Sequence, residues 1–154
     1  MRISARVDYA VRALVELAAA EKGPVKGDVI AARQGVPVNF LENILGDLRR
    51  AGVVASQRGA VGGYWLAVPA ESVSVADVIR TVEGPLADVR GEAIEELDYP
   101  GAAASLRDVW VATRASLRCV LEQVTIADVA GGQLPEVVGR LNETAGAWVR
   151  RPIS

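Results

Sequence analysis

Three arginines lie close together in the sequence, beside a stretch rich in glycine. Arg49 and Arg50 end a segment whose apolar residues recur at helical spacing, and Arg58 begins the stretch 58–64, which contains three glycines. Guanidinium groups bind phosphate oxygens through paired hydrogen bonds, and glycines allow a backbone to approach another molecule closely. The stretch lacks the spacing of a nucleotide-binding loop and the Lys-Ser/Thr pair that follows one. The pattern therefore favours the phosphates of a nucleic acid over a bound nucleotide.

Side chains that could catalyse a reaction are scarce in this chain. It has no histidine and one cysteine, Cys119. Since Ser/His and Cys/His pairs cannot form, we expect neither an enzyme nor a bound cofactor. Arg118 could favour the thiolate of Cys119, so Cys119 is a candidate redox thiol, with a buried and inert thiol as the alternative. The carboxylates of residues 92–98 could hold a hard cation only in a defined loop, so we expect a solvated acidic surface there.

Charge divides the chain into two unlike halves. The net charge is −2 over 154 residues, but residues 1–68 carry nine Lys/Arg against six Asp/Glu, and residues 69–154 carry eight against thirteen. A basic first half suits a polyanionic partner, and an acidic second half suits another task. The chain begins without an apolar signal core, and no apolar segment approaches the length of a membrane span. We therefore expect a cytoplasmic protein without a membrane partner.

Apolar periodicity predicts a mainly helical fold with one small β-hairpin. Helices are expected over residues 5–20, 26–34, 38–51, 74–83, 103–124 and 134–149, and strands over residues 53–57 and 64–68. Gly35 falls in the tight turn between the second and third helices, which is the pattern of a helix-turn-helix. Because a hairpin with a basic tip follows the third helix, the sequence predicts a winged helix-turn-helix.

The long helix predicted over residues 103–124 carries an apolar stripe whose members alternate spacings of four and three. The members of this stripe are Leu106, Trp110, Thr113, Leu117, Val120 and Val124. Such spacing is typical of helices that pair in a coiled coil. We predict that the stripe pairs with the same helix of a second copy. The alternative is that it packs on its own domain.

Several segments, taken in order, resemble one family of bacterial transcription regulators. They are residues 1–4 and 9–14 in the first helix, 34–42 and 48–54 around the third helix, 58–64 in the wing, 78–85 in the fourth helix, and 106–110 and 124–129 near the ends of the long helix. On these segments, which cover roughly residues 1–130, the chain resembles the IscR/NsrR/CymR family. The resemblance implies a homodimer that binds imperfect palindromic operators in double-stranded DNA, usually as a repressor.

The chain departs from the sensing members of that family in one respect. Those members bind an iron–sulfur cluster through three cysteines between the fourth helix and the dimerisation helix. The corresponding residues 86–105 contain no cysteine. Because a cluster needs several thiolates held together, the chain resembles the cluster-free members, which answer to other signals such as a small effector or a partner protein.

The residues expected to contact DNA come from the second and third helices and the wing. They are Lys26, Arg33, Val38, Asn39, Phe40, Glu42, Asn43, Arg49, Arg50, Arg58 and Gly59. The amides of Asn39 and Asn43 can donate to and accept from base edges in the major groove, and Glu42 can accept from the amino group of cytosine. The hairpin places Arg58 where a guanidinium can enter a narrow minor groove. The alternatives are a local helix cap for Asn39 and solvated surface for the charged residues.

Together these features predict a homodimeric, sequence-specific DNA-binding transcription regulator that acts as a repressor without an iron–sulfur cluster. We expect a DNA-binding domain at residues 1–84. Residues 85–154 are expected to hold an effector or linker loop, the long dimerisation helix and a C-terminal helix. The alternative function is a protein-interaction module or corepressor whose DNA binding depends on a partner protein or a small effector.

Overall fold

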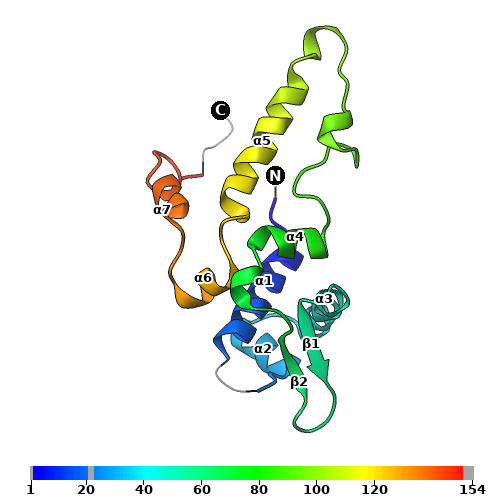
Figure 1. The fold of residues 1–154 in the computed structure, drawn as a ribbon, viewed down its shortest axis with the longest axis vertical. Helices are drawn as coiled ribbons and strands as arrows, with labels where there is room; N and C mark the ends of the chain where they lie inside the picture. The colour runs from blue at the N-terminus through cyan, green and yellow to red at the C-terminus, as the bar shows by residue number, and fades with distance from the viewer. Residues whose placement is uncertain (1, 21–22, 151–154) are drawn as a thin grey trace.

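The computed structural model describes residues 2–20 and 23–150. Its elements are α1 (Ala5–Ala19), α2 (Gly27–Gln34), α3 (Val38–Arg50), β1 (Val54–Gln57), β2 (Gly63–Leu66), the 3₁₀ turn η1 (Ala70–Ser72), α4 (Val75–Val82), η2 (Ile94–Glu96), η3 (Gly101–Ala103), α5 (Leu106–Leu121), α6 (Ile126–Gly131) and α7 (Glu136–Asn142). Helices α1 to α4, α6 and the hairpin form a body, from which α5 extends away (Figure 1). The predicted fold class, mainly helical with one hairpin, is confirmed.

The helix-turn-helix forms where apolar spacing and turn chemistry predict it. Gly35 ends α2 in the left-handed region, with φ of 61°, which lets the chain reverse into α3. Leu41, Ile44, Leu45 and Leu48 line the inner face of α3 and are at most 1% exposed. Each such side chain gains about 1.5–3 kcal/mol by leaving water. Their burial therefore fixes which face of α3 stays outside.

The hairpin is a two-stranded antiparallel ribbon. Its register runs from Val54 opposite Leu66 to Gln57 opposite Gly63. On its other side, Tyr64 exchanges two backbone hydrogen bonds with Val25, each 2.8 Å long. The segment before α2 thus adds a short bridge to β2, which ties the hairpin to the body.

The chain returns to the body after α5. An isolated backbone bridge joins Ser74 to Thr125, and the N–H of Val75 donates to the carbonyl of Val124 at 2.8 Å. Ile126 is fully buried in the same apolar core as the inner faces of α1 and α3. Helix α6 therefore packs with the first part of the chain, while the division at residue 84 stays a prediction.

Two helices are shorter than the sequence predicts. The helix expected over residues 103–124 is α5, Leu106–Leu121, because residues 101–103 form the 3₁₀ turn η3 and Val124 already lies in the extended return to the body. The helix expected over residues 134–149 is α7, which starts after Pro135 and ends at Asn142. Gly146 then takes a positive φ of 83°, which a helix cannot hold.

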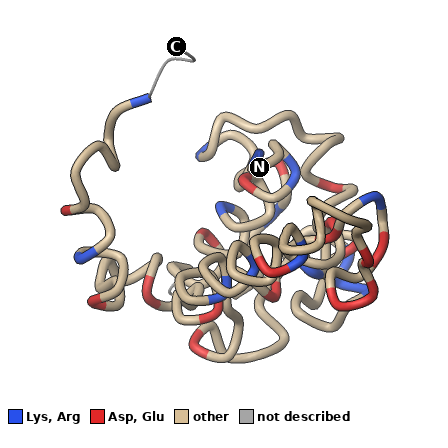
Figure 2. Tube along the Cα trace, turned by 90° about the horizontal axis from the view of Figure 1, so that it is seen from above, with Lys and Arg blue, Asp and Glu red and all other residues tan. Residues whose placement is uncertain are grey.

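The chain after α6 extends to one side of the rest of the molecule (Figure 2). Of the residues described, α7 buries one, Val137, and it touches α5. Among the described helices, none combines the length and the apolar character that crossing a bilayer requires.

Candidate nucleic-acid interface

Helix α3 presents polar side chains to solvent on the face opposite its buried stripe. Asn39, Glu42 and Asn43 are all exposed there. A helix with exposed hydrogen-bonding side chains on its first two turns can lie in the major groove with these groups at base edges. The structure thus brings these three predicted residues together on one surface.

The two apolar residues predicted at this face are also exposed, Val38 by 40% and Phe40 by 39%. The Phe40 ring meets the ring of Tyr9 edge to face, with centroids 5.7 Å apart and an interplanar angle of 89°. The guanidinium carbon of Arg12 lies 5.5 Å from the centroid of the same Tyr9 ring. Phe40 therefore helps to pack α3 on α1, and its contact with DNA stays a prediction.

Lys26 and Arg33 lie at the two ends of α2. Lys26 is exposed immediately before the helix. Arg33 lies in the last turn, where its Nη1 donates to Glu16 Oε2 at 3.3 Å and its side chain stays 57% exposed. Since a surface pair of this kind contributes at most about 1 kcal/mol, Arg33 can exchange Glu16 for a phosphate at little cost.

The two arginines at the end of α3 have different partners. Arg49 Nη1 donates to Ser56 Oγ at 3.1 Å and so connects α3 to β1. Arg50 pairs with Asp47 one turn earlier, and Asp47 also pairs with Arg6 of α1. The sequence analysis missed Asp47, although its spacing of three from Arg50 is the signal for such a pair. Because two guanidinium groups share one carboxylate, this end of α3 keeps an excess of positive charge.

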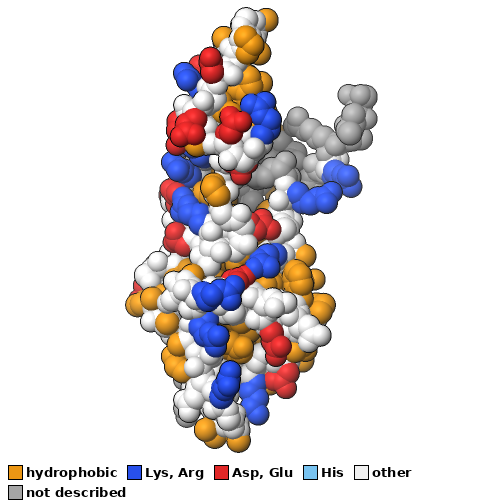
Figure 3. All heavy atoms as spheres, turned by 90° about the vertical axis from the view of Figure 1, so that its right-hand side faces the viewer, with side chains coloured by type: hydrophobic (Ala, Val, Ile, Leu, Met, Phe, Trp, Pro, Cys, Tyr) orange, Lys and Arg blue, Asp and Glu red, His pale blue; other side chains and the backbone are white. Residues whose placement is uncertain are grey.

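Arg58 lies exposed at the tip of the hairpin, where Gly59 follows with φ of 108° and open space around it. Basic side chains gather in a band down the lower part of the face that carries α3 and the hairpin (Figure 3). Arg33 lies on α2 and Arg58 at the tip of the hairpin, and both α2 and β1 contact α3. Phosphates that flank a major groove would lie beside such groups.

Gly62 and Gly63 are required by the hairpin itself. A Cβ atom at Gly62 would lie 2.2 Å from the carbonyl oxygen of Gln57. One at Gly63 would lie 2.7 Å from the carbonyl carbon and oxygen of Val25. The sequence analysis attributes the glycines of this stretch to close approach to another molecule. For these two residues the close approach is to the chain's own backbone.

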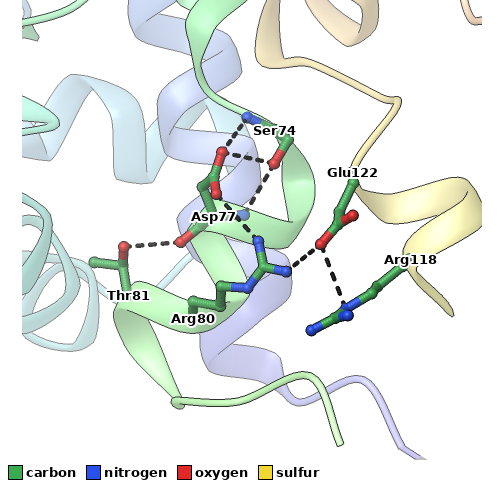
Figure 4. Close-up of polar contacts among 6 residues, drawn as sticks. All are labelled: Ser74, Asp77, Arg80, Thr81, Arg118 and Glu122. Carbon is green, nitrogen blue, oxygen red and sulfur yellow. Dashed lines mark hydrogen bonds and ion pairs between the residues drawn. The ribbon is translucent and has the colours of Figure 1, made fainter. Parts of the chain in front are cut away.

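A network of ion pairs and hydrogen bonds connects α4 to the end of α5 (Figure 4). Ser74 begins α4 in a capping box: its N–H donates to Asp77 Oδ2 at 3.0 Å, and the Asp77 N–H donates to Ser74 Oγ at 3.1 Å. Arg80 Nη1 donates to Asp77 Oδ1 at 3.3 Å, and Arg80 Nη2 pairs with Glu122 just after α5. Arg118 Nε lies 3.6 Å from the same Glu122 carboxylate. Glu122 is therefore shared between an arginine of the body and an arginine of α5.

These contacts shift the pKa values of two groups of the network, Arg80 and Asp77. The hydrogen bond to Glu122 raises the pKa of Arg80 against the opposing effect of burial. Burial alone would raise the pKa of Asp77, but hydrogen bonds from Ser74 and Arg80 outweigh it and leave that pKa below its ordinary value of 3.8. Both shifts favour the charged forms of Asp77 and Arg80 at neutral pH.

We expect Asp77→Asn to lower the free energy of unfolding by about 1 kcal/mol at pH 7, because it removes the carboxylate of the capping box. Since folding lowers the pKa of Asp77, its contribution is complete above the unfolded-state value of 3.8 and is lost as the pH falls through the folded-state value. The difference between variant and wild type should therefore shrink in acid. Urea unfolding at pH 7 and again below pH 3.8 measures it. A difference of the same size at both pH values would contradict this account.

Comparison with known proteins identifies the family. Residues 3–132 match the Rrf2 family, described as an iron-dependent transcriptional regulator. The chain belongs to the Rrf2 family. It is 33% identical to the HTH-type transcriptional regulator CymR of Bacillus subtilis over 131 residues, which cover 84% of this chain and 90% of that one. It is 54% identical to a Mycobacterium tuberculosis protein assigned as an HTH-type transcriptional regulator over 142 residues, 92% of this chain and 88% of that one.

Solved structures agree with this assignment. The structure of CymR, the global cysteine regulator of B. subtilis, matches with a TM-score of 0.72 and 32% identity, over 86% of this chain and 98% of that one. T. potens IscR matches with a TM-score of 0.70 and 34% identity, over 86% of this chain and 88% of that one. The Rrf2 chain is thus a DNA-binding transcriptional regulator and not an enzyme. The predicted family resemblance is confirmed.

The Rrf2 description names iron, but the donor set of this chain does not fit an iron–sulfur cluster. Clusters are held by several thiolates, with histidine as an occasional substitute. This Rrf2 chain has one cysteine and no histidine. Across residues 2–20 and 23–150, no three His, Cys, Asp or Glu side chains come together as a metal site, the acidic stretch 92–98 included.

Cys119 lies exposed on α5. The alternative of a buried thiol is therefore wrong, because no described element covers α5 at this position. The Nε2 of Gln123 donates to the Cys119 carbonyl at 2.6 Å and lies 3.9 Å from its Sγ. The role of Cys119 as a redox thiol stays a prediction.

The predicted dimer stripe turns partly toward the chain's own loop. Trp110 Nε1 donates to the hydroxyl of Tyr99 at 3.1 Å. A cavity of about 520 Å³ lies between Trp110, Thr113 and Leu117 on one side and residues 85–89 and 94 of that loop on the other. The loop covers the stripe incompletely, since none of the sixteen residues of α5 is buried.

The ends of the stripe have different surroundings. Leu106 and Val120 are half-buried on α5, and Thr113 is exposed. Val124 lies beyond α5 in the extended segment that returns to the body, and it is 7% exposed. The chain itself therefore already covers Val124. Pairing of the other five residues with a second copy stays a prediction.

Proposed function

We propose that this Rrf2 protein is a homodimer that binds a specific operator in double-stranded DNA. The proposal is based on the exposed polar face of α3, which carries Asn39, Glu42 and Asn43, and on the exposed basic side chains of α2, the end of α3 and the hairpin. A helix in the major groove obtains base contacts from such side chains and its register from the flanking phosphate contacts.

Homodimer formation is supported by α5. The helix is sixteen residues long and buries none of them. Val109 is 52% exposed on it, beside the predicted stripe. A helix of this length with an uncovered apolar edge gains stability by packing on a partner. Two copies joined along α5 would place two copies of α3 on one duplex, as a palindromic operator needs.

We further propose that the protein acts as a repressor and works without an iron–sulfur cluster. The resemblance to IscR, NsrR and CymR implies repression, in which an occupied operator blocks transcription. The absence of a cluster is supported by the sequence, which has one cysteine and no histidine to act as ligands. The absorption spectrum of protein purified without oxygen tests it, because a brown solution with a charge-transfer band would contradict a cluster-free protein.

A gel-shift titration against salt tests the DNA-binding proposal. The probes are fragments from upstream of the protein's own gene, with a shuffled fragment of equal length as the control. A specific operator complex should outlast competitor DNA, and its affinity should fall steeply as salt rises. Equal binding to operator and shuffled fragments, or binding that salt does not change, would favour the protein-interaction alternative.

Arg58→Ala should weaken operator binding by roughly tenfold or more at fixed salt and reduce the salt slope by about one. Its melting temperature should not change, because Arg58 lies exposed at the hairpin tip. Arg107→Ala is the matched control, since it removes an exposed arginine from α5. If both variants bind the operator equally, the wing is not a contact with DNA.

A further inference from the structure

A hollow of about 760 Å³ lies between the end of α4, the loop 84–93 and α5. Its charged lining comes from Arg80 of α4, Arg114 and Arg118 of α5, and two carboxylates. This volume is within the range of about 300–1,000 Å³ that is typical of small-molecule sites. No residue predicted to contact DNA lines the hollow, so it is a separate surface.

Arg114 and Arg118 project into the hollow from one face of α5. They are four residues apart, so their side chains lie one turn from each other. Arg114 is 20% exposed, and its Nη1 donates to Glu95 Oε2 at 2.6 Å. Arg118 meets Glu122 through Nε. Because a guanidinium has five N–H donors, these contacts leave both arginines with donors for a further acceptor.

The lining itself holds more arginines than carboxylates, and the carboxylates of Glu122 and Asp77 beside it pair with Arg118 and Arg80. Asp88 and Glu95 are the acidic members, against three arginines. Asp88 Oδ1 accepts the N–H of Gly91 at 2.9 Å, so this carboxylate is held by the backbone of the loop. Glu95 is the carboxylate that already neutralises Arg114. The remaining lining is uncharged, which strengthens the attraction of the guanidinium groups for an anion.

We propose that this hollow binds a small polyvalent anion, a di- or tricarboxylate or a phosphate, through Arg114 and Arg118. Four residues of α-helix rise about 6 Å, a separation that two acidic groups of one small molecule can span. Each group accepts paired hydrogen bonds from one guanidinium, which is the geometry that arginine favours. Arg80 lies in the lining on the α4 side, where it pairs with Asp77 and Glu122.

An anion in this hollow acts on the link between α4 and α5. Arg118 and Arg80 share the Glu122 carboxylate, so an anion bound to the remaining donors of Arg118 would lie near that carboxylate and repel it. Helix α4 packs on α1 and α3 of the body. The anion would therefore change how α5 is held on the DNA-binding body. This regulatory consequence rests on the proposed function, whereas the binding itself does not.

Isothermal titration calorimetry with citrate and with inorganic phosphate tests the site, at an ionic strength fixed with sodium chloride. We expect one-to-one binding of at least one of the two anions to the full chain. Arg114→Gln together with Arg118→Gln should lower the affinity tenfold or more, because two charge-assisted contacts are lost. Preference for citrate would indicate a carboxylate ligand, and preference for phosphate would indicate a phosphate ligand.

Glu95→Gln is the matched control. It breaks the same ion pair as Arg114→Gln but leaves the guanidinium and removes a negative charge, so the anion should bind equally or more tightly. Arg107→Gln, outside the lining, should change nothing. Binding of neither anion, equal affinity of the wild type and the double variant, or loss of binding in Glu95→Gln would overturn the site. Gel shifts on the same variants separate this failure from a failure of DNA binding.

Discussion

Gly63→Ala should lower the free energy of unfolding by about 3 kcal/mol and release the hairpin from the body. Gly63 has φ of 149°, and an added Cβ would lie 2.7 Å from the carbonyl of Val25. That carbonyl accepts from the N–H of Tyr64 at 2.8 Å, and the Val25 N–H donates back to Tyr64 at 2.8 Å. The backbone of Val25 cannot retreat from the Cβ without breaking both bonds.

Thermal unfolding measures this loss, and a fall in melting temperature of roughly 6–12 °C corresponds to it in a chain of this size. Operator affinity should fall as well, because the hairpin carries Arg58. Gly59→Ala is the matched control. It also has a positive φ, 108°, but no atom lies within 4 Å of its added Cβ, so only backbone strain of about 1 kcal/mol is expected. Equal losses in the two variants would contradict the contact between Gly63 and Val25.

The DNA-binding face follows from the sequence because its signals are local. The spacing of the leucines of α3 fixes its inner face, and the polar residues between them are then outward by the geometry of the helix. Gly35 marks the turn before α3, and Arg58 marks the tip of the hairpin. Each of these features depends on residues a few positions apart, so one sequence suffices to find them.

Contacts between distant segments could not be found in the same way. Asp47 pairs with Arg6, which lies in α1, and nothing in the spacing of the chain connects them. The apolar spacing predicts a helix up to Val124, but α5 ends at Leu121, and the chain then forms a backbone bridge from Thr125 to Ser74 before α6. A local pattern indicates where a helix can form, and long-range pairing decides where it ends.

The hollow beside α5 shows most clearly that contacts between distant segments cannot be predicted from local spacing. Residues 84–93 have no apolar periodicity, and the arginines that line the hollow with them follow at positions 114 and 118. The sequence analysis considers the acidic residues 92–98 as one group. In the structure, Glu95 instead pairs with Arg114 across the loop. Acidic residues that are neighbours in the sequence thus need not act as one group, because one of them can pair with an arginine of another helix.

Val109→Glu should convert the protein from a dimer to a monomer and weaken operator binding by a hundredfold or more, because it would place two carboxylates in one apolar interface. Val109 is 52% exposed in the single chain, so the substitution should leave the folding of each subunit unchanged. Sedimentation velocity at micromolar concentration, together with the melting temperature of each variant, measures both effects.

Val111→Glu is the control that decides the question. Val111 is 41% exposed on the same helix. Residues two positions apart in a helix point about 200° away from each other, so Val111 lies on the opposite side from Val109. The two substitutions add the same charge to the same helix, and only Val109→Glu touches the proposed interface. A dimer that survives Val109→Glu, or that both substitutions disrupt equally, would exclude this edge of α5 as the interface. If the wild-type protein stays monomeric even on operator DNA, the proposed homodimer is wrong, and a palindromic operator is no longer expected.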